Sequence, residues 1–198
     1  MWRIGLTGSI ATGKSTVLQA FADLGVPIFS ADAAVAALYA GEAVGPVEAL
    51  FPGTAVNGRI DKAALSQALA ADPSGFARLE ALIHPLVRAR IAQFLDEATA
   101  AGHAIAVVEV PLLFESGFDY GFDAVGVTWV DPAVQRQRAL ARPGMSGEKL
   151  DTILARQLPQ DDKKARATYL FDTGLPIDKT VDMVAALVAA IRAKGPEQ

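Results

Sequence analysis

The fold of this chain is decided by the stretch Gly8-Ser9-Ile10-Ala11-Thr12-Gly13-Lys14-Ser15. It fits the pattern G-x-x-x-x-G-K-[ST] of a phosphate-binding P-loop. The two glycines allow backbone angles that a Cβ disfavours, so that successive N–H groups can turn inward around a phosphate. Lys14 supplies a positive charge for the β- and γ-phosphates, and the Ser15 hydroxyl is a hard oxygen ligand for Mg²⁺. We therefore expect the phosphates of a nucleotide to be bound by Gly8, Ser9, Ile10, Ala11, Thr12, Gly13, Lys14, Ser15 and Thr16.

The residues on both sides of this stretch have the order that the motif requires. Residues 2–7 (WRIGLT) predict a short strand that enters the loop. Residues 15–22 predict a helix that leaves it, with Val17, Leu18 and Phe21 on one side. The free N–H groups at the start of such a helix point at the same anion. A glycine-rich turn with a purely structural role explains this combination less well.

Composition limits the class of protein. A chain of 198 residues can form one α/β domain with an embedded subdomain. The hydrophobic fraction of 52% is largely alanine, and no apolar run approaches membrane-spanning length. A net charge of −4 argues against a nucleic-acid partner, and the absence of cysteine excludes disulfides. No apolar signal core precedes the P-loop, so we expect a cytoplasmic protein without an obligate protein partner.

Further strands and helices are predicted along the chain. Strands are expected at residues 25–29, 105–113, 124–130 and 169–171, and an amphipathic helix at 178–193 closes the chain. Residues 33–101 have a helical pattern, with Asp61 as a cap, a helix starting at Pro73 and a break or kink near His84, before Pro85. This stretch is longer than a simple crossover between parallel strands needs. The fold class is therefore α/β, a parallel P-loop sheet flanked by helices, with an inserted helical domain.

Two acidic residues follow predicted strands, where ligands of open α/β sheets bind. Asp32 follows the strand at 25–29 and could serve the site or cap the next helix. Glu109 lies at the end of the strand at 105–113 and could be a second acidic element of the site or a solvent-facing acid. We favour a functional role for Asp32 and leave both interpretations of Glu109 open.

Two arginines lie on one face of a predicted helix. Arg138 and Arg142 are four residues apart, where like charges repel unless an anion lies between them. A lid that brings both guanidinium groups to the transferring phosphoryl group is favoured over a solvated basic face, because Pro143-Gly144 gives the helix a hinge-like end. The mixed charges at 161–166 indicate a helix face exposed to solvent.

Together these motifs resemble the dephospho-CoA kinase family, which phosphorylates the ribose 3′-hydroxyl of dephospho-CoA with ATP. The matching segments are residues 5–8 and 13–16, Ala31-Asp32, Ile83-His84-Pro85-Leu86, Val110-Pro111-Leu112-Leu113-Phe114-Glu115, Arg138, Arg142, Arg156-Gln157 and Lys163. The resemblance implies three parts. The P-loop core would comprise residues 1–32, 104–135 and 168–198, the helical CoA-binding insertion residues 33–103, and the lid residues 136–167.

The resemblance also implies roles for individual residues. Lys14, Asp32, Arg138 and Arg142 would be catalytic, with Asp32 as the base that faces the acceptor hydroxyl. Ser15 would bind Mg²⁺. The residues expected to contact dephospho-CoA are Asp32, His84, Arg88, Leu112 and Glu115. For His84, a structural role before proline is favoured over a bond to a substrate phosphate.

The chain departs from the family pattern at four positions. Ser9 replaces a glycine at a variable position of the loop, and Ser30 stands where an aspartate is common. Thr168 and Thr173 stand where the family usually has Asp and Asn, so the adenine contacts of that asparagine are in question. The alternatives are another small-molecule kinase of this architecture, and a regulatory nucleotide switch. The switch is disfavoured because the chain lacks the guanine-reading Asn-Lys-x-Asp segment.

Overall fold

The structure of this chain is a computed structural model, and it describes residues 1–72 and 74–194. The helix start predicted at Pro73 and the terminal residues 195–198 lie outside the described residues. The chain divides into two compact units. The first comprises residues 1–29 and 95–198, and the second comprises residues 30–94.

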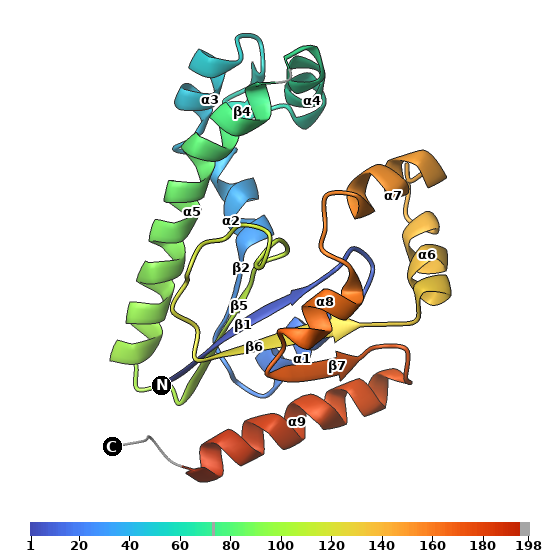
Figure 1. The fold of residues 1–198 in the computed structure, drawn as a ribbon. Coiled ribbons are helices and arrows are strands. Elements are labelled where there is room, and N and C mark those ends of the chain that lie inside the picture. Colours follow the sequence, from blue (N-terminus) through green and yellow to red (C-terminus); the bar gives the residue numbers. More distant parts are fainter. Residues whose placement is uncertain (73, 195–198) are drawn as a thin grey trace. The chain divides into compact units, whose positions relative to one another are not determined.

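The centre of the first unit is a parallel sheet (Figure 1). Within the described residues, its strand order is β2 (Ile28–Ser30), β5 (Ile105–Glu109), β1 (Trp2–Gly8), β6 (Ala124–Trp129) and β7 (Tyr169–Asp172). Strand β1 pairs in parallel with β5 and β6, and β6 pairs in parallel with β7. All five residues of β5 are buried, as its continuous apolar run predicts. The parallel sheet flanked by helices is confirmed.

Helices α1 (Lys14–Asp23) and α9 (Ile177–Lys194) pack against each other and against the sheet. The rings of Phe21 on α1 and Phe171 on β7 meet edge to face, with 6.1 Å between their centroids. Val184, Val188 and Ile191 of α9 complete this core. The apolar face predicted for α1 is therefore buried, and most of the face predicted for α9 is buried as well, although Val181 is exposed.

Three shorter helices follow β6. They are α6 (Pro132–Leu140), α7 (Gly147–Leu154) and α8 (Gln160–Ala165). Asp131 accepts a hydrogen bond from the N–H of Ala133 and caps α6, and Ser146 caps α7 in the same way through Lys149. The Nζ atom of Lys164 on α8 lies 4.7 Å from the centre of the Trp129 ring at the end of β6.

The second unit is mainly helical. It contains α2 (Ala31–Leu38), α3 (Val44–Leu50), α4 (Lys62–Ala71) and most of α5 (Gly75–Ala100). Asp61 caps α4 as expected, since its carboxylate accepts from the N–H of Ala64 at 2.8 Å. A small hairpin of β3 (Ala55–Val56) and β4 (Arg59–Ile60) was not predicted. Its turn is Asn57-Gly58, both at positive φ (50° and 72°), a common hairpin signal that was overlooked.

A break or kink was predicted near Pro85, and the break is wrong, because α5 is one helix of 26 residues that contains Pro85. A proline inside a helix costs about 3 kcal/mol, since it lacks an N–H and its ring crowds a carbonyl one turn earlier. The buried face of α5 offsets this cost. Burying one large apolar side chain stabilises by about 1.5–3 kcal/mol, and this face buries Leu79, Ile83, Val87 and Ile91.

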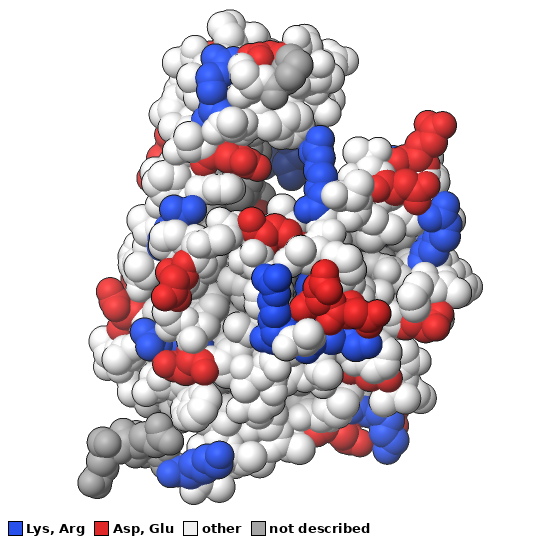
Figure 2. Space-filling model, in the orientation of Figure 1, with Lys and Arg blue, Asp and Glu red and all other residues white. Residues whose placement is uncertain are grey.

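Charges are mixed over the surface. On the face drawn in Figure 2, Lys and Arg side chains lie among Asp and Glu side chains. Among the helices that the structure describes, none is both long and apolar enough to span a membrane.

Candidate active site

The P-loop turns sharply where β1 ends. A Cβ at Gly8 would lie 2.7 Å from Thr12 Oγ1 and 2.8 Å from the Thr128 carbonyl oxygen, so only glycine fits. Gly13 has a φ of 81°, which favours glycine, and Ala11 also lies in the left-handed region, at 61°. The side chains of Ser9 and Thr12 are buried beneath the loop. The backbone therefore curls around a space at the N-terminus of α1.

The cationic and hydroxyl groups of the motif lie at that N-terminus. Lys14 Nζ donates to the carbonyl oxygens of Gly8 (2.9 Å) and Ser9 (3.3 Å), so the ammonium group lies across the loop. Ser15 and Thr16 occupy the first turn of α1. The first N–H groups of an α-helix have no carbonyl one turn earlier within the helix, and for this reason helix N-termini bind anions.

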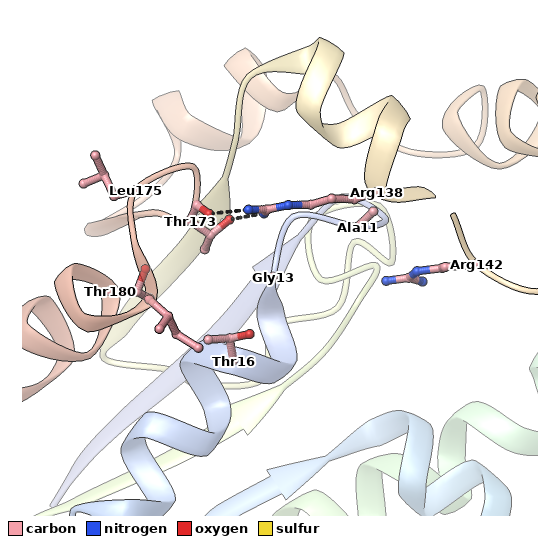
Figure 3. Close-up of a pocket in the computed structure, with 9 residues that line it drawn as sticks. Ala11, Gly13, Thr16, Arg138, Arg142, Thr173, Leu175 and Thr180 are labelled. Carbon is pink, nitrogen blue, oxygen red and sulfur yellow. Dashed lines mark hydrogen bonds between the residues drawn. The ribbon is translucent and has the colours of Figure 1, made fainter. Parts of the chain in front are cut away.

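A cavity of about 320 Å³ adjoins the loop (Figure 3). Three segments line it: the loop with the start of α1, helix α6 with the residues after it, and the segment from the end of β7 into α9. The lining residues are Ala11, Gly13, Thr16, Arg138, Arg142, Thr173, Leu175, Ile177 and Thr180. The structure thus places both predicted arginines beside the P-loop.

The two arginines have different surroundings. The Arg138 guanidinium donates to the carbonyl oxygen of Thr173 at 2.8 Å and to its Oγ1 at 3.3 Å (Figure 3). Thr173 Oγ1 in turn donates to the carbonyl oxygen of Thr12 at 2.9 Å. Arg138 is thereby tied to the cavity wall, whereas Arg142 lines the cavity from the turn after α6. The two arginines therefore do not lie on one helix, as their spacing had predicted.

Three of the residues that depart from the family pattern form hydrogen bonds within the protein. Thr173 joins the P-loop to Arg138, as described above, in place of an asparagine. Thr168 Oγ1 accepts from the N–H of Val125 at 3.1 Å, which secures the start of β7 beside β6. Ser30 caps α2, with its Oγ accepting from the N–H of Ala33 at 3.4 Å. Thr173, Leu175 and Ile177 form one wall of the cavity. The sequence feature that indicates this role is their position just after a strand of a parallel sheet, where ligands bind.

The segment after β5 carries a buried ion pair. Glu115 Oε1 lies 2.8 Å from Lys163 Nζ and accepts from the N–H of Leu158 at 2.9 Å. Lys163 is completely buried, so the solvated face predicted for residues 161–166 is wrong at this position. Burial opposes ionisation of Glu115, but Lys163 and the Leu158 N–H outweigh it and hold the pKa of the carboxyl below its usual value. Leu112, in the same segment, is 41% exposed.

We predict that Lys163→Met destabilises the protein by about 3–5 kcal/mol, because it leaves a mostly buried carboxylate without its cation. For a chain of this size the melting temperature should fall by roughly 10 °C. The double variant Lys163→Met with Glu115→Gln removes both charges and keeps an acceptor for Leu158, so it should regain much of the loss. Calorimetric unfolding measures both effects. Equal melting temperatures for the single and double variants would contradict this account.

The same pair predicts a pH dependence. Because the folded-state pKa of Glu115 lies below its unfolded value, its contribution to stability is complete above the unfolded value, near 4.5. The contribution is lost as the pH falls through the folded-state pKa. The difference in stability between wild type and Glu115→Gln should therefore disappear in acid.

Glu109 is only 7% exposed and ends β5, opposite Leu6 of β1. The interpretation as a solvent-facing acid is therefore wrong. A buried acid at the carboxyl end of a central strand lies where the sheet forms its binding edge.

The remaining predicted residues belong to the second unit. Asp32 is exposed in the first turn of α2, and its interpretation as the helix cap is wrong because Ser30 is the cap. His84 is exposed and Arg88 is partly buried, one turn apart on α5. The roles predicted for Asp32, His84 and Arg88 rest on the resemblance.

A magnesium site would have to draw on few protein ligands. Among the residues that the structure describes, no three His, Asp or Glu side chains gather closely enough to hold a metal ion. This arrangement suits Mg²⁺, which keeps several waters and is bound through one or two protein oxygens together with substrate phosphates. Ser15, at the start of α1, is the hydroxyl that fits this description.

Comparison with known proteins places the chain in a family. A family model described as dephospho-CoA kinase matches residues 2–176. The chain belongs to the dephospho-CoA kinase family. A dephospho-CoA kinase of Rhodopseudomonas palustris is 50% identical over 175 residues, 88% of each chain. One from Rhizobium etli is 47% identical over 192 residues, 97% of this chain and 95% of the relative. The resemblance noted in the sequence is confirmed.

Solved structures share the fold of this chain. A Thermus thermophilus protein is 30% identical with a TM-score of 0.80, and each chain is covered to 96%. The dephospho-CoA kinase of Campylobacter jejuni shares the fold, with a TM-score of 0.68 at 22% identity and 96% coverage of each chain.

Proposed function

We propose that this chain transfers the γ-phosphoryl group of ATP to the ribose 3′-hydroxyl of dephospho-CoA and so completes coenzyme A. The observation that carries the proposal is the P-loop cavity shared with Arg138 and Arg142, in a chain whose family is dephospho-CoA kinase. In this step the acceptor oxygen bonds to the γ-phosphorus while the bond from that phosphorus to the bridging oxygen breaks. ADP leaves with the electron pair of that bond.

The nucleotide would be held by the first unit. Residues 8–16 would surround the phosphates, and Lys14 would move from the loop carbonyls onto the β- and γ-phosphates. Ser15 would hold Mg²⁺, which neutralises the charge that these phosphates share. The base of ATP fits the wall of Leu175 and Ile177, which are 46% and 67% exposed and offer an apolar surface to a planar ring.

Residues proposed to contact the acceptor occur in each unit. Residues 30–94 form the larger part of the proposed CoA-binding insertion (33–103), where His84 and Arg88 would meet the anionic groups of dephospho-CoA. Asp32 would accept the proton of the 3′-hydroxyl. Leu112 is an exposed apolar side chain suited to the substrate. Glu115, engaged by Lys163, would shape the segment that carries Leu112.

The test supplies Mg·ATP with dephospho-CoA, adenosine, AMP or shikimate and measures ADP and the phosphorylated product. Dephospho-CoA should be the best acceptor by kcat/KM, because contacts to its adenylate and pantetheine parts contribute to transition-state binding. A higher kcat/KM with AMP or shikimate than with dephospho-CoA would show that the chain acts on another acceptor. Slow hydrolysis of ATP without transfer to any acceptor would indicate a nucleotide switch.

Arg142, in the proposed lid (136–167), gives a further prediction. Arg142→Ala should lower kcat by about 10²-fold or more, with a smaller change in the Kd for dephospho-CoA, because its charge matters most as the phosphoryl group moves. Arg136→Ala is the matched control, since Arg136 lies on α6, just before Arg142 in the chain, and pairs with the exposed Asp151. An unchanged kcat in both Arg138→Ala and Arg142→Ala would show that these residues form a solvated basic face and take no part in the transfer.

A further inference from the structure

Two glutamines outside the P-loop motif contact the backbone of one loop residue. Gln157, just after α7, accepts a hydrogen bond from the Ile10 N–H, with 2.9 Å between N and Oε1. Gln135, on α6, donates through Nε2 to the Ile10 carbonyl oxygen at 2.8 Å. The backbone of Ile10 is therefore held from both sides by side chains that follow it by more than 120 residues.

A third glutamine fixes the direction of these bonds. The Val130 N–H donates to Gln160 Oε1, and Gln160 Nε2 donates to the Val130 carbonyl oxygen, both at 3.1 Å. Gln160 Nε2 also donates to Gln135 Oε1 at 2.9 Å. A backbone N–H can only donate and a carbonyl can only accept. Val130 therefore orients Gln160, Gln160 orients the 6% exposed Gln135, and the amide nitrogen of Gln135 must face Ile10.

The held residue precedes the strained part of the loop. Ala11, at a φ of 61°, lies in a region that residues other than glycine occupy when the surrounding structure holds them there. The Thr12 N–H is already bonded to the Ser9 carbonyl at 3.3 Å. With the Ile10 N–H engaged by Gln157, the first half of the loop is fixed by the protein, and the second half offers its N–H groups to phosphate.

We infer that Gln135 and Gln157 are positioning residues that hold the Ile10 backbone and so preform the phosphate cradle. The inference rests on the proposed function only in that the cradle binds a nucleotide. Because Gln157 lies in the proposed lid and Gln135 just before it, the same bonds connect the lid to the P-loop.

The opposite polarity of the two bonds gives a sharp test. A Gln→Glu change adds the same charge in both places but has different consequences. Gln157→Glu keeps an acceptor for the Ile10 N–H, whereas Gln135→Glu turns a carboxylate oxygen toward the Ile10 carbonyl. Gln137→Glu is the charge control, since Gln137 is an exposed residue of the same helix as Gln135. Binding of ADP with Mg²⁺ is measured by titration calorimetry, and folding by the melting temperature.

Gln135→Glu should weaken ADP binding about tenfold or more relative to Gln137→Glu, as expected for a buried hydrogen bond replaced by two facing acceptors. Gln157→Glu should stay within about threefold of that control, and Gln157→Met, which lacks the acceptor, should again lose about tenfold. Dephospho-CoA binding should change little in all of them. Equal ADP affinity for Gln135→Glu and Gln157→Glu, or wild-type affinity for Gln157→Met, would overturn the inference. Failure of the wild type to bind ADP would count against the proposed function instead.

A measurement on the wild type remains decisive if a variant does not fold. In the nucleotide-free protein, hydrogen exchange at the Ile10 amide should be much slower than at an exposed loop amide such as Gly117. Exchange at the same rate would show that the bond from Ile10 to Gln157 does not hold the loop.

Discussion

Lys14→Ala should abolish measurable phosphoryl transfer while the protein keeps its fold. In a loose transition state the protein contributes mainly positioning and charge stabilisation, so losing this ammonium group should lower kcat by about 10³-fold or more. Its hydrogen bonds to the carbonyls of Gly8 and Ser9 contribute about 1 kcal/mol each to stability. The melting temperature should therefore fall by only a few degrees, roughly 2–4 °C per kcal/mol.

The control for Lys14 is Lys179→Ala, which removes an exposed lysine paired with Asp182 on α9. Steady-state kinetics with Mg·ATP and dephospho-CoA and a thermal melt are recorded for both variants. Near-wild-type turnover of Lys14→Ala would show that the P-loop lysine has no role in the mechanism. A large drop in its melting temperature would instead assign it a structural role.

Asp32→Asn should bind both substrates and transfer slowly. A positioned base contributes about 10²- to 10⁴-fold to a rate, toward the lower end where the transition state is dissociative. Asp32 is exposed in the first turn of α2 and is not the cap of that helix, so the amide should leave stability almost unchanged. The kcat should therefore fall with little change in the Kd values for ATP and dephospho-CoA.

Asp61→Asn is a matched control, because Asp61 begins another helix of the same unit and asparagine caps a helix about as well as aspartate. It should keep both activity and melting temperature. If Asp32→Asn is fully active, another group receives the proton of the acceptor hydroxyl. If it fails to bind dephospho-CoA, Asp32 contributes to binding rather than to proton transfer.

Features encoded in short, local patterns could be predicted from the sequence. The P-loop, the buried run of β5 and the cap at Asp61 each depend on residues within a few positions of one another. The hairpin turn at Asn57-Gly58 was equally local and was missed. The spacing of Arg138 and Arg142 predicted that both would lie on one helix face, which is wrong because α6 ends at Leu140, yet both line the P-loop cavity.

Features that join distant parts of the chain could not be predicted in this way. The charges around Lys163 suggest an exposed helix until its partner Glu115, 48 positions earlier, is known. Pro85 predicts a break unless the burial along the whole of α5 is counted against it. The bonds from Gln135 and Gln157 to Ile10 depend on how α6 and the residues after α7 pack, which no local pattern encodes.

The contact between Lys164 and the ring of Trp129 has a practical consequence. An ammonium group 4.7 Å from an indole changes the energy of its excited state, so the fluorescence of Trp129 reports the position of α8. The chain has two tryptophans, and the other, Trp2, lies at the start of β1. A Trp2→Phe variant would carry a single tryptophan, beside α8 of the proposed lid. Substrate binding could then be followed in stopped-flow experiments without any attached dye.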